Sequence, residues 1–186
     1  ELELGRYGIA EIPLSYFSIS DASIREGENS NITITRTGHI STTQTLRVQS
    51  SDGSATLSND DYAQINKTVT FAAGETSKTI SVSTTADLDV EDDETFTLTI
   101  TAEGKDDVPP QISDGRATVS IKADDFKRSN SLYTVVDGPT WEEAEANAVA
   151  LSGHLVTIND QEENDWLVEN LKDLDAIKGD SQYINH

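Results

Sequence analysis

The residues of this sequence that could do chemistry are carboxylates, and they gather in four places. The densest is the run Asp87–Glu94, in which only Leu88 and Val90 are not acidic, and the smaller ones are Glu26, Asp52 and the pair Asp124–Asp125. Oxygen ligands select hard cations, and flexible loops that supply many oxygens suit Ca²⁺ better than the octahedral demands of Mg²⁺. The sequence contains no cysteine that could favour a softer metal. These residue types indicate a calcium site, if the fold brings the four places together.

The elements that must position these acids are short strands. From Tyr16 to about Lys122, apolar residues alternate with Ser and Thr in seven segments, and clusters of Gly, Asn, Asp and Ser separate the segments. This pattern predicts a mainly β fold, a seven-stranded antiparallel immunoglobulin-like β-sandwich. Its expected inward-facing residues are Phe17, Ile19, Ile32, Ile34, Leu46, Val48, Val69, Phe71, Ile80, Val82, Phe96, Leu98, Ile100, Val119 and Ile121.

Strand direction then predicts where the acids lie. If the seven strands, A to G, reverse direction in turn, the A–B, C–D and E–F connections and the end of G share one pole. Those four places hold the four acidic sets. Two carboxylates about 5 Å apart repel by roughly 3 kcal/mol at an effective dielectric near 20. A single loop acid is more often simply solvated, but four acidic segments at one pole favour a bound cation.

Two other functions for the acids fit the sequence less well. The run from Asp87 is not an EF-hand loop, because its sixth position is not Gly and the segments on both sides alternate as strands. Catalysis is also disfavoured, because the three histidines, His39, His154 and His186, share no motif with a nucleophile. We therefore expect a protein that is not an enzyme.

Composition narrows the range of partners. The net charge is −21, from 34 acidic and 13 basic residues, and this charge repels nucleic acids and anionic membrane surfaces. No apolar run approaches the roughly 20 residues of a membrane helix, so no membrane insertion is expected. The sequence begins at Glu1 without Met, which we interpret as a piece of a longer polypeptide, with residues 1–14 as a linker or the end of a preceding domain.

The pattern changes after the predicted sandwich. Residues 126–130 are predicted to be a linker, after which Trp141, Ala144, Ala148 and Leu151 form a helical stripe behind a Thr140 cap. We predict a strand at 154–158. A second helix, at about 160–174, would place four apolar residues on one side: Trp166, Leu167, Leu171 and Leu174.

The first of these regions, residues 15–125, resembles a Calx-beta domain, the calcium-binding sandwich of sodium-calcium exchangers, integrin β4 and bacterial surface proteins. The resemblance rests on residues 52–55, Asp61–Tyr62, 69–76, 87–96 and 117–125. It implies calcium ligation by Glu26, Asp52, Asp87, the backbone carbonyl of Asp89, Glu91, Glu94, Asp124 and Asp125. Ala86 and Ala123 stand where strongly binding members carry further Asp residues, so one or two ions are expected in place of four. For Asp61 and Tyr62 we expect structural roles, in loop hydrogen bonds and in packing.

Residues 131–186 resemble the first half of an α+β C-type lectin-like domain. The resemblance rests on Leu132–Tyr133, Trp141, residues 153–158 and Glu163 ahead of Trp166–Leu167. It implies an incomplete, cysteine-free domain, because Ala148 stands where many animal members have a disulfide cysteine. In this motif His154 is a structural residue, and the sugar and calcium ligands of the family would lie in the missing second half.

Together these observations predict a calcium-binding structural or adhesive module of a larger extracellular or cell-surface multidomain protein, secreted from the cell. Its ions would stabilise one pole of the sandwich and the joint to the next domain. Its partners would be calcium, neighbouring domains of the same polypeptide, and a carbohydrate or another surface protein. The alternative is a carbohydrate-binding adhesin with its sugar site in the missing lectin half. An intracellular calcium sensor is a third and less favoured hypothesis.

Overall fold

The computed structural model describes residues 9–104 and 108–178, which form strands over most of their length and helices only near the end. The strands are β1 (Ser15–Ile19), β2 (Ala22–Arg25), β3 (Asn29–Gly38), β4 (Gln44–Ser51), β5 (Asn66–Phe71), β6 (Ser77–Ser83), β7 (Glu94–Glu103), β8 (Gln111–Asp114), β9 (Arg116–Lys122), β10 (Asp125–Arg128) and β11 (Ser131–Thr134). The helices are α1 (Trp141–Ala150) and α2 (Gln161–Lys178).

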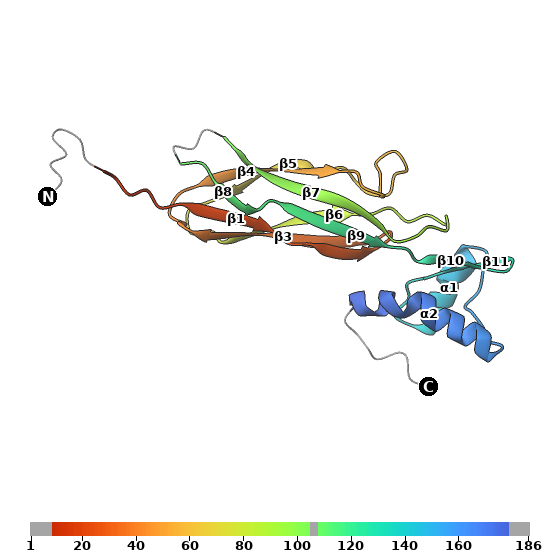
Figure 1. Cartoon of the computed structure of the whole chain (residues 1–186). Helices are drawn as coiled ribbons and strands as arrows, with labels where there is room; N and C mark the ends of the chain where they lie inside the picture. Colours follow the sequence, from red (N-terminus) through yellow and green to blue (C-terminus); the bar gives the residue numbers. More distant parts are fainter. Residues whose placement is uncertain (1–8, 105–107, 179–186) are drawn as a thin grey trace.

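Strands β1 to β9 form an elongated two-layer sandwich (Figure 1). One sheet has the order β6-β3-β1-β8, and the other has the order β2-β9-β7-β4-β5. Each of the seven expected segments contains a strand, but the described part of the sandwich has nine strands in place of seven, because β2 and β8 are additional short strands beside β1 and β9 in the sequence. The expectation of a wholly antiparallel fold is also wrong, since β1 pairs with β8 and β2 with β9 in parallel. When seven strands alternate in direction, the first and the seventh run the same way, so their pairing is parallel.

Two short breaks let the chain cross between the sheets. After β1, Ser20 donates its amide to the carbonyl of Thr33 (3.1 Å), and the carboxylate of Asp21 accepts the amide of Thr118 (2.7 Å). Between β8 and β9, a Cβ on Gly115 would lie 2.6 Å from a methyl carbon of Ile112. Glycine therefore permits the chain to pass close to its own strand at the second break.

The core lies between the two sheets. Every apolar residue expected to face inward is buried there except Val69, which is partly buried at the edge of the core. The ring of Tyr62 stacks on that of Phe96, with centroids 3.9 Å apart. This burial confirms the period-two pattern and leaves the loops at the two ends free to carry polar residues.

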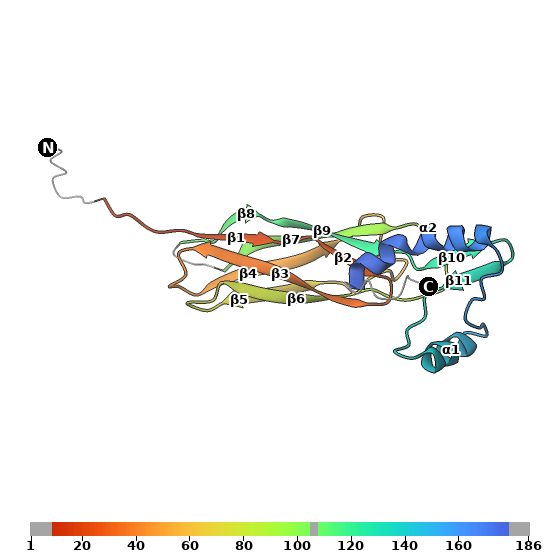
Figure 2. The ribbon, with the colours of Figure 1, turned by 90° about the horizontal axis from the view of Figure 1, so that it is seen from below.

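The segment after the sandwich begins with a β-hairpin. Residues 126–130, expected to be a linker, instead form most of β10 and its turn to β11, in which Ser129 has a positive φ of 56°. Figures 1 and 2 show this hairpin and both helices at one end of the sandwich. The division into domains at residues 15, 125 and 131 stays a prediction.

The helices follow the sequence pattern only in part. Thr140 caps α1 as expected, because its hydroxyl accepts the amide of Glu143. Of the predicted α1 stripe only Ala148 is fully buried, and Trp141 is 69% exposed. In α2, Leu167 is buried, and the side chain of Leu174 lies outside the described part. Neither of the described helices has both the length and the apolar composition for crossing a bilayer.

The strand expected at 154–158 does not form. No strand is present between β11 and α2, and residues 154–158 are mostly exposed. A strand requires a neighbouring strand edge to satisfy its backbone, and no described segment pairs with this one.

Candidate metal centre

The four acidic segments meet at the pole of the sandwich that carries the hairpin (Figure 1). They are the turn between β2 and β3, the β4–β5 loop, the β6–β7 loop, and residues 123–125 after β9. Because alternating strand direction brings these connections to one end, the predicted convergence of the segments is present in the fold.

A tight turn positions Glu26 against the β6–β7 loop. Gly27 has a φ of 71°, and a Cβ on it would lie 2.6 Å from the Cβ of Ala86. Only glycine allows both this backbone conformation and this approach. The carboxylate of Glu26 consequently accepts the amide of Asp87 at 2.9 Å.

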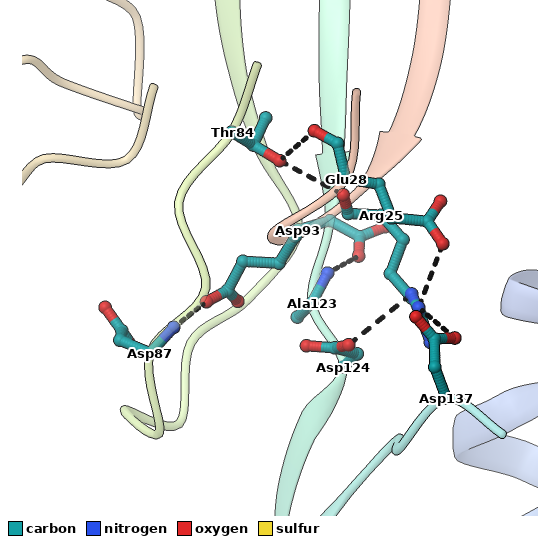
Figure 3. A network of polar contacts seen from close by, with 9 residues as sticks. Arg25, Glu28, Thr84, Asp87, Asp93, Ala123, Asp124 and Asp137 are labelled. Atoms are coloured by element: carbon teal, nitrogen blue, oxygen red, sulfur yellow. Dashed lines mark hydrogen bonds and ion pairs between the residues drawn. The ribbon is translucent and has the colours of Figure 1, made fainter. Parts of the chain in front are cut away.

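The β6–β7 loop is also fastened at its two ends (Figure 3). Near its start, the hydroxyl of Thr84 donates to the carbonyls of Arg25 and Glu28, each at 3.1 Å. Near its end, Asp93 pairs with Lys122 and accepts the amide of Ala123 at 3.2 Å. The acids between these anchors are therefore held over the end of β9.

Six of the carboxylates form two groups of three. In the first, which we call the Glu26 group, Glu26, Asp87 and Asp125 each offer an oxygen, and these atoms lie within 4.8 Å of one another. In the second, the Glu94 group, Asp61, Glu91 and Glu94 do the same. Five of the six, all but Asp125, line one small cavity of about 10 Å³. Each group could hold a cation through carboxylate oxygens alone.

Asp125 provides the clearest sign of a missing partner. The residue is 1% exposed, and in the described part of the chain neither of its carboxylate oxygens accepts a hydrogen bond of normal geometry. Burial raises the pKa of Asp125, and an interaction with the side chain of Thr134, opposite it in the hairpin, offsets part of this rise. Buried carboxylates are normally paired, hydrogen-bonded or bound to metal. The position of Asp125 in the Glu26 group therefore fits a metal ligand.

Burial and mutual repulsion raise the pKa values at this pole. Burial, helped by the charges of Asp124, Asp87 and Asp125, raises the pKa of Glu26 to about 7. Burial, helped by Asp61 and Glu91, raises the pKa of Glu94 to about 7. The pKa values of Glu91 and Asp125 are also raised, chiefly by burial. A bound cation would reverse these shifts, because it favours the ionised form.

Three of the eight predicted ligands lie outside both carboxylate groups. Asp52 accepts the hydroxyl of Tyr62 (2.6 Å) and the amide of Leu57 (3.1 Å), so it organises the β4–β5 loop. Asp124 faces Arg25, with Nε and Oδ2 3.6 Å apart. Asp89, predicted to ligate through its carbonyl, donates its amide to the carboxylate of Asp87 at 2.7 Å. Ligation by any of the eight residues stays a prediction.

Asp61 belongs to a carboxylate group, although the sequence analysis predicted only a structural role for it. Its expected structural role is present, since its carboxylate accepts the amide of Thr56 at 2.6 Å. The same carboxylate also belongs to the Glu94 group. The signal was available, because Asp61 lies in the C–D connection, which strand direction already placed at the acidic pole. The expected packing of Tyr62 is confirmed by its burial and by its stacking on Phe96.

The fold and the pole together define a class, a β-sandwich module with an acidic loop pole. The sequence profile of the Calx-beta domain matches residues 10–125, and the chain belongs to the Calx-beta domain family. The apo form of the Calx CBD1 domain superposes with a TM-score of 0.54 at 20% identity, over 60% of this chain and 99% of that one. CBD12 from CALX1.2 superposes with a TM-score of 0.53 at 20% identity, over 59% of this chain and 44% of that one.

These comparisons confirm the resemblance of the sandwich. They support the fold, and the family match ends at residue 125. The lectin-like nature of the segment from Ser131 therefore stays a prediction.

Proposed function

We propose that the acidic pole binds one or two calcium ions, with the Glu26 group and the Glu94 group each able to hold one. The observation that carries this proposal is the buried carboxylate of Asp125, which lacks a normal hydrogen bond and lies beside Glu26 and Asp87. Calcium takes six to eight oxygens, so each group of three carboxylates would need bidentate contacts, backbone carbonyls or water to complete the shell. The match to the Calx-beta family supports the same reading.

The ions would act structurally and not catalytically. The ligands come from loops that only the folded sandwich brings together, so calcium binds the folded state and stabilises it. Asp125 is also the first residue of β10. An ion at the Glu26 group would therefore fix the start of the hairpin and stiffen the joint to the segment that follows.

We further propose that this module belongs to a larger extracellular or cell-surface protein with a structural or adhesive role. Support for this setting comes from the lectin-like resemblance of the segment from Ser131 and from the acidic composition. Millimolar calcium outside cells would keep such a pole occupied even at the weak affinities of extracellular modules.

Calorimetric titration of metal-stripped protein tests the proposal. We expect saturable binding of one or two calcium ions per chain and much weaker binding of magnesium. Asp125→Asn should weaken calcium binding at least tenfold, whereas the matched variant Asp114→Asn, in the exposed strand β8, should leave it unchanged. Absence of calcium binding by the unmodified protein at millimolar concentration would overturn the proposal.

A further inference from the structure

Arg25 is the last residue of β2 (Figure 3). It lies at the acidic pole among three carboxylates that belong to neither the Glu26 group nor the Glu94 group. Its Nη2 is 2.9 Å from Glu28 Oε1 and 3.1 Å from Asp137 Oδ1, and its Nε is 3.6 Å from Asp124 Oδ2. The guanidinium is buried, and Nε has no hydrogen bond of normal geometry. One permanent positive charge is thus shared by three acids.

In two pairs of adjacent residues, one member belongs to the cluster around Arg25 and the other belongs to the Glu26 group. Glu26 follows Arg25 in the sequence and belongs to the Glu26 group, and Asp125 follows Asp124 and belongs to the same group. In each pair the two adjacent side chains therefore face different partners. The pole therefore has two electrostatic centres side by side, one formed by carboxylates alone and one that contains its own cation.

The Arg25 centre also reaches the segment after the sandwich. Asp137 lies between β11 and α1, and its carbonyl accepts the side-chain amide of Asn147 in α1 at 2.6 Å. The amide of Val135 donates to the carbonyl of Asp124 at 3.3 Å. Through Asp124, Arg25 is connected to Val135, just after β11. Through Asp137 it is connected to Asn147 in α1.

We propose that Arg25 is a built-in cation of the pole, which keeps Asp124 out of the calcium site and fastens Asp137, so that the joint persists when calcium is removed. The calcium part of this inference rests on the proposed function. The physical reason is charge, because a calcium ion that used Asp124 would have to lie close to the positively charged guanidinium of Arg25. Arg25 therefore restricts the ions to the Glu26 and Glu94 groups.

The two centres would then provide two different attachments at the joint, one that needs a bound ion and one that does not. The Glu26 group holds Asp125, the start of β10, only when an ion is present. Arg25 holds Asp124 and Asp137 through contacts that need no bound ion. Calcium removal should loosen one attachment and leave the other intact.

The test replaces the arginine and measures both calcium stoichiometry and the joint. Arg25→Gln removes the guanidinium that faces Asp124, and we expect it to bind one more calcium ion per chain than the unmodified protein. In EDTA, amide exchange at Val135 should be at least tenfold faster than in the unmodified protein, and calcium should reverse most of this change. Arg47→Gln is the matched control, because Arg47 pairs with Glu103 at 3.6 Å on the partly exposed face of β4, away from the pole. It should change neither quantity.

A second pair of variants keeps Arg25 in place. Asp124→Asn should change calcium affinity less than threefold, whereas Asp125→Asn should reduce it at least tenfold. Equal losses for the two variants would overturn the proposal, as would an Arg25→Gln protein with unchanged stoichiometry and unchanged Val135 exchange. If Arg25→Gln does not fold, the Asp124 and Asp125 comparison decides.

The same experiments separate this proposal from the one before it. If the unmodified protein binds no calcium, the proposed function fails. Amide exchange at Val135 in calcium-free Arg25→Gln then still tests whether Arg25 fastens the joint. Faster exchange than in the unmodified protein supports this role, and unchanged exchange overturns it.

Discussion

The sandwich and the segment after it differ in how completely each covers its own apolar residues. The sandwich closes two sheets over a continuous core in which residues such as Phe17, Leu46 and Phe96 are fully buried. The segment at 125–178 has a two-stranded hairpin and two helices around a groove of about 730 Å³. Trp141, Val156 and Ile158 are about half exposed or more. We therefore expect the sandwich to be the more stable region and the segment to depend more on its attachments to the pole.

Hydrogen exchange should show the largest difference between the two regions. We expect amides in β3, β4 and β7 to exchange at least about a thousandfold more slowly than amides in β11 and α1, because local opening requires little free energy where few apolar contacts are lost. Mass spectrometry of the intact chain with calcium present measures this difference. Similar protection in both regions of a monodisperse monomer would show that the segment is a complete folding unit.

The two ends of a single strand provide the next comparison. Glu94 begins β7 at the acidic pole and Glu103 ends it at the opposite pole. We expect Glu94→Gln to weaken calcium binding at least about thirtyfold, equivalent to about 2 kcal/mol, because it removes a ligand charge. Glu103→Gln should leave calcium binding unchanged in the same calorimetric titration.

Other substitutions at the pole extend this comparison. Asp87→Ala and Glu91→Ala should also weaken calcium binding, as Glu94→Gln does, since each removes one member of a carboxylate group. Asp106, the distant control suggested by strand direction alone, lies outside the described residues. Equal effects of Glu94→Gln and Glu103→Gln would contradict the placement of the site at one pole.

The pH dependence should have opposite signs with and without calcium. The pKa values of Glu26 and Glu94, about 7 in the folded protein, lie above those of the unfolded chain. The calcium-free folded state therefore binds more protons between about pH 4.5 and 7, and its free energy of unfolding falls as pH rises through that window. Calcium requires the ionised carboxylates, so its affinity should rise at least about tenfold from pH 5.5 to 7.5.

Two sets of measurements check these signs. Thermal melts in EDTA should give a lower Tm at pH 8 than at pH 5, and calcium titrations near pH 6.5 should release protons into the buffer. With free calcium at about 100 times Kd, the added stability is about 2.7 kcal/mol. At about 2–4 °C per kcal/mol for a chain of this size, Tm should rise by roughly 5–11 °C. A calcium-free Tm that increased steadily from pH 5 to 8 would contradict the raised pKa values.

Much of the fold and the convergence of the acidic loops could be predicted, because the fold follows from periodicity and the convergence from strand direction. Alternation with period two fixed the buried face of residues such as Ile32, Val48 and Leu98, and strand direction placed the acidic loops together. The roles of individual carboxylates could not be read in this way. Asp124 and Asp125 are adjacent and chemically identical, yet one faces Arg25 and the other joins the Glu26 group. That difference depends on three-dimensional neighbours which spacing does not reveal.

The segment after the sandwich was harder to predict for a related reason. The Thr140 cap is a local interaction and was identified correctly, whereas the strand expected at 154–158 needed a partner edge elsewhere. Residues 126–130 were expected to be a linker because their charge differs from that of the flanking chain. Pairing of Asp125 with Thr134 and of Arg128 with Ser131 instead makes them part of a hairpin. The capping signal predicted its own local structure, whereas strand formation depended on pairing partners that the spacing of residues did not reveal.

The smallest expected effect concerns the Thr140 cap, and it tests whether the two regions unfold separately. Thr140 accepts the amide of Glu143 at 3.2 Å and donates its hydroxyl to the carboxylate of Glu143 at 2.9 Å. Thr140→Ala removes both interactions and should cost about 1 kcal/mol of helix stability. If the region opens independently of the sandwich, amide exchange in α1 should become about fivefold faster while the main Tm stays unchanged. Thr140→Ser, which keeps the hydroxyl, should restore most of the protection. A fall of several degrees in the main Tm would show instead that α1 and the sandwich unfold together, and that attachment through Arg25 and Asp137 makes the whole chain one cooperative unit.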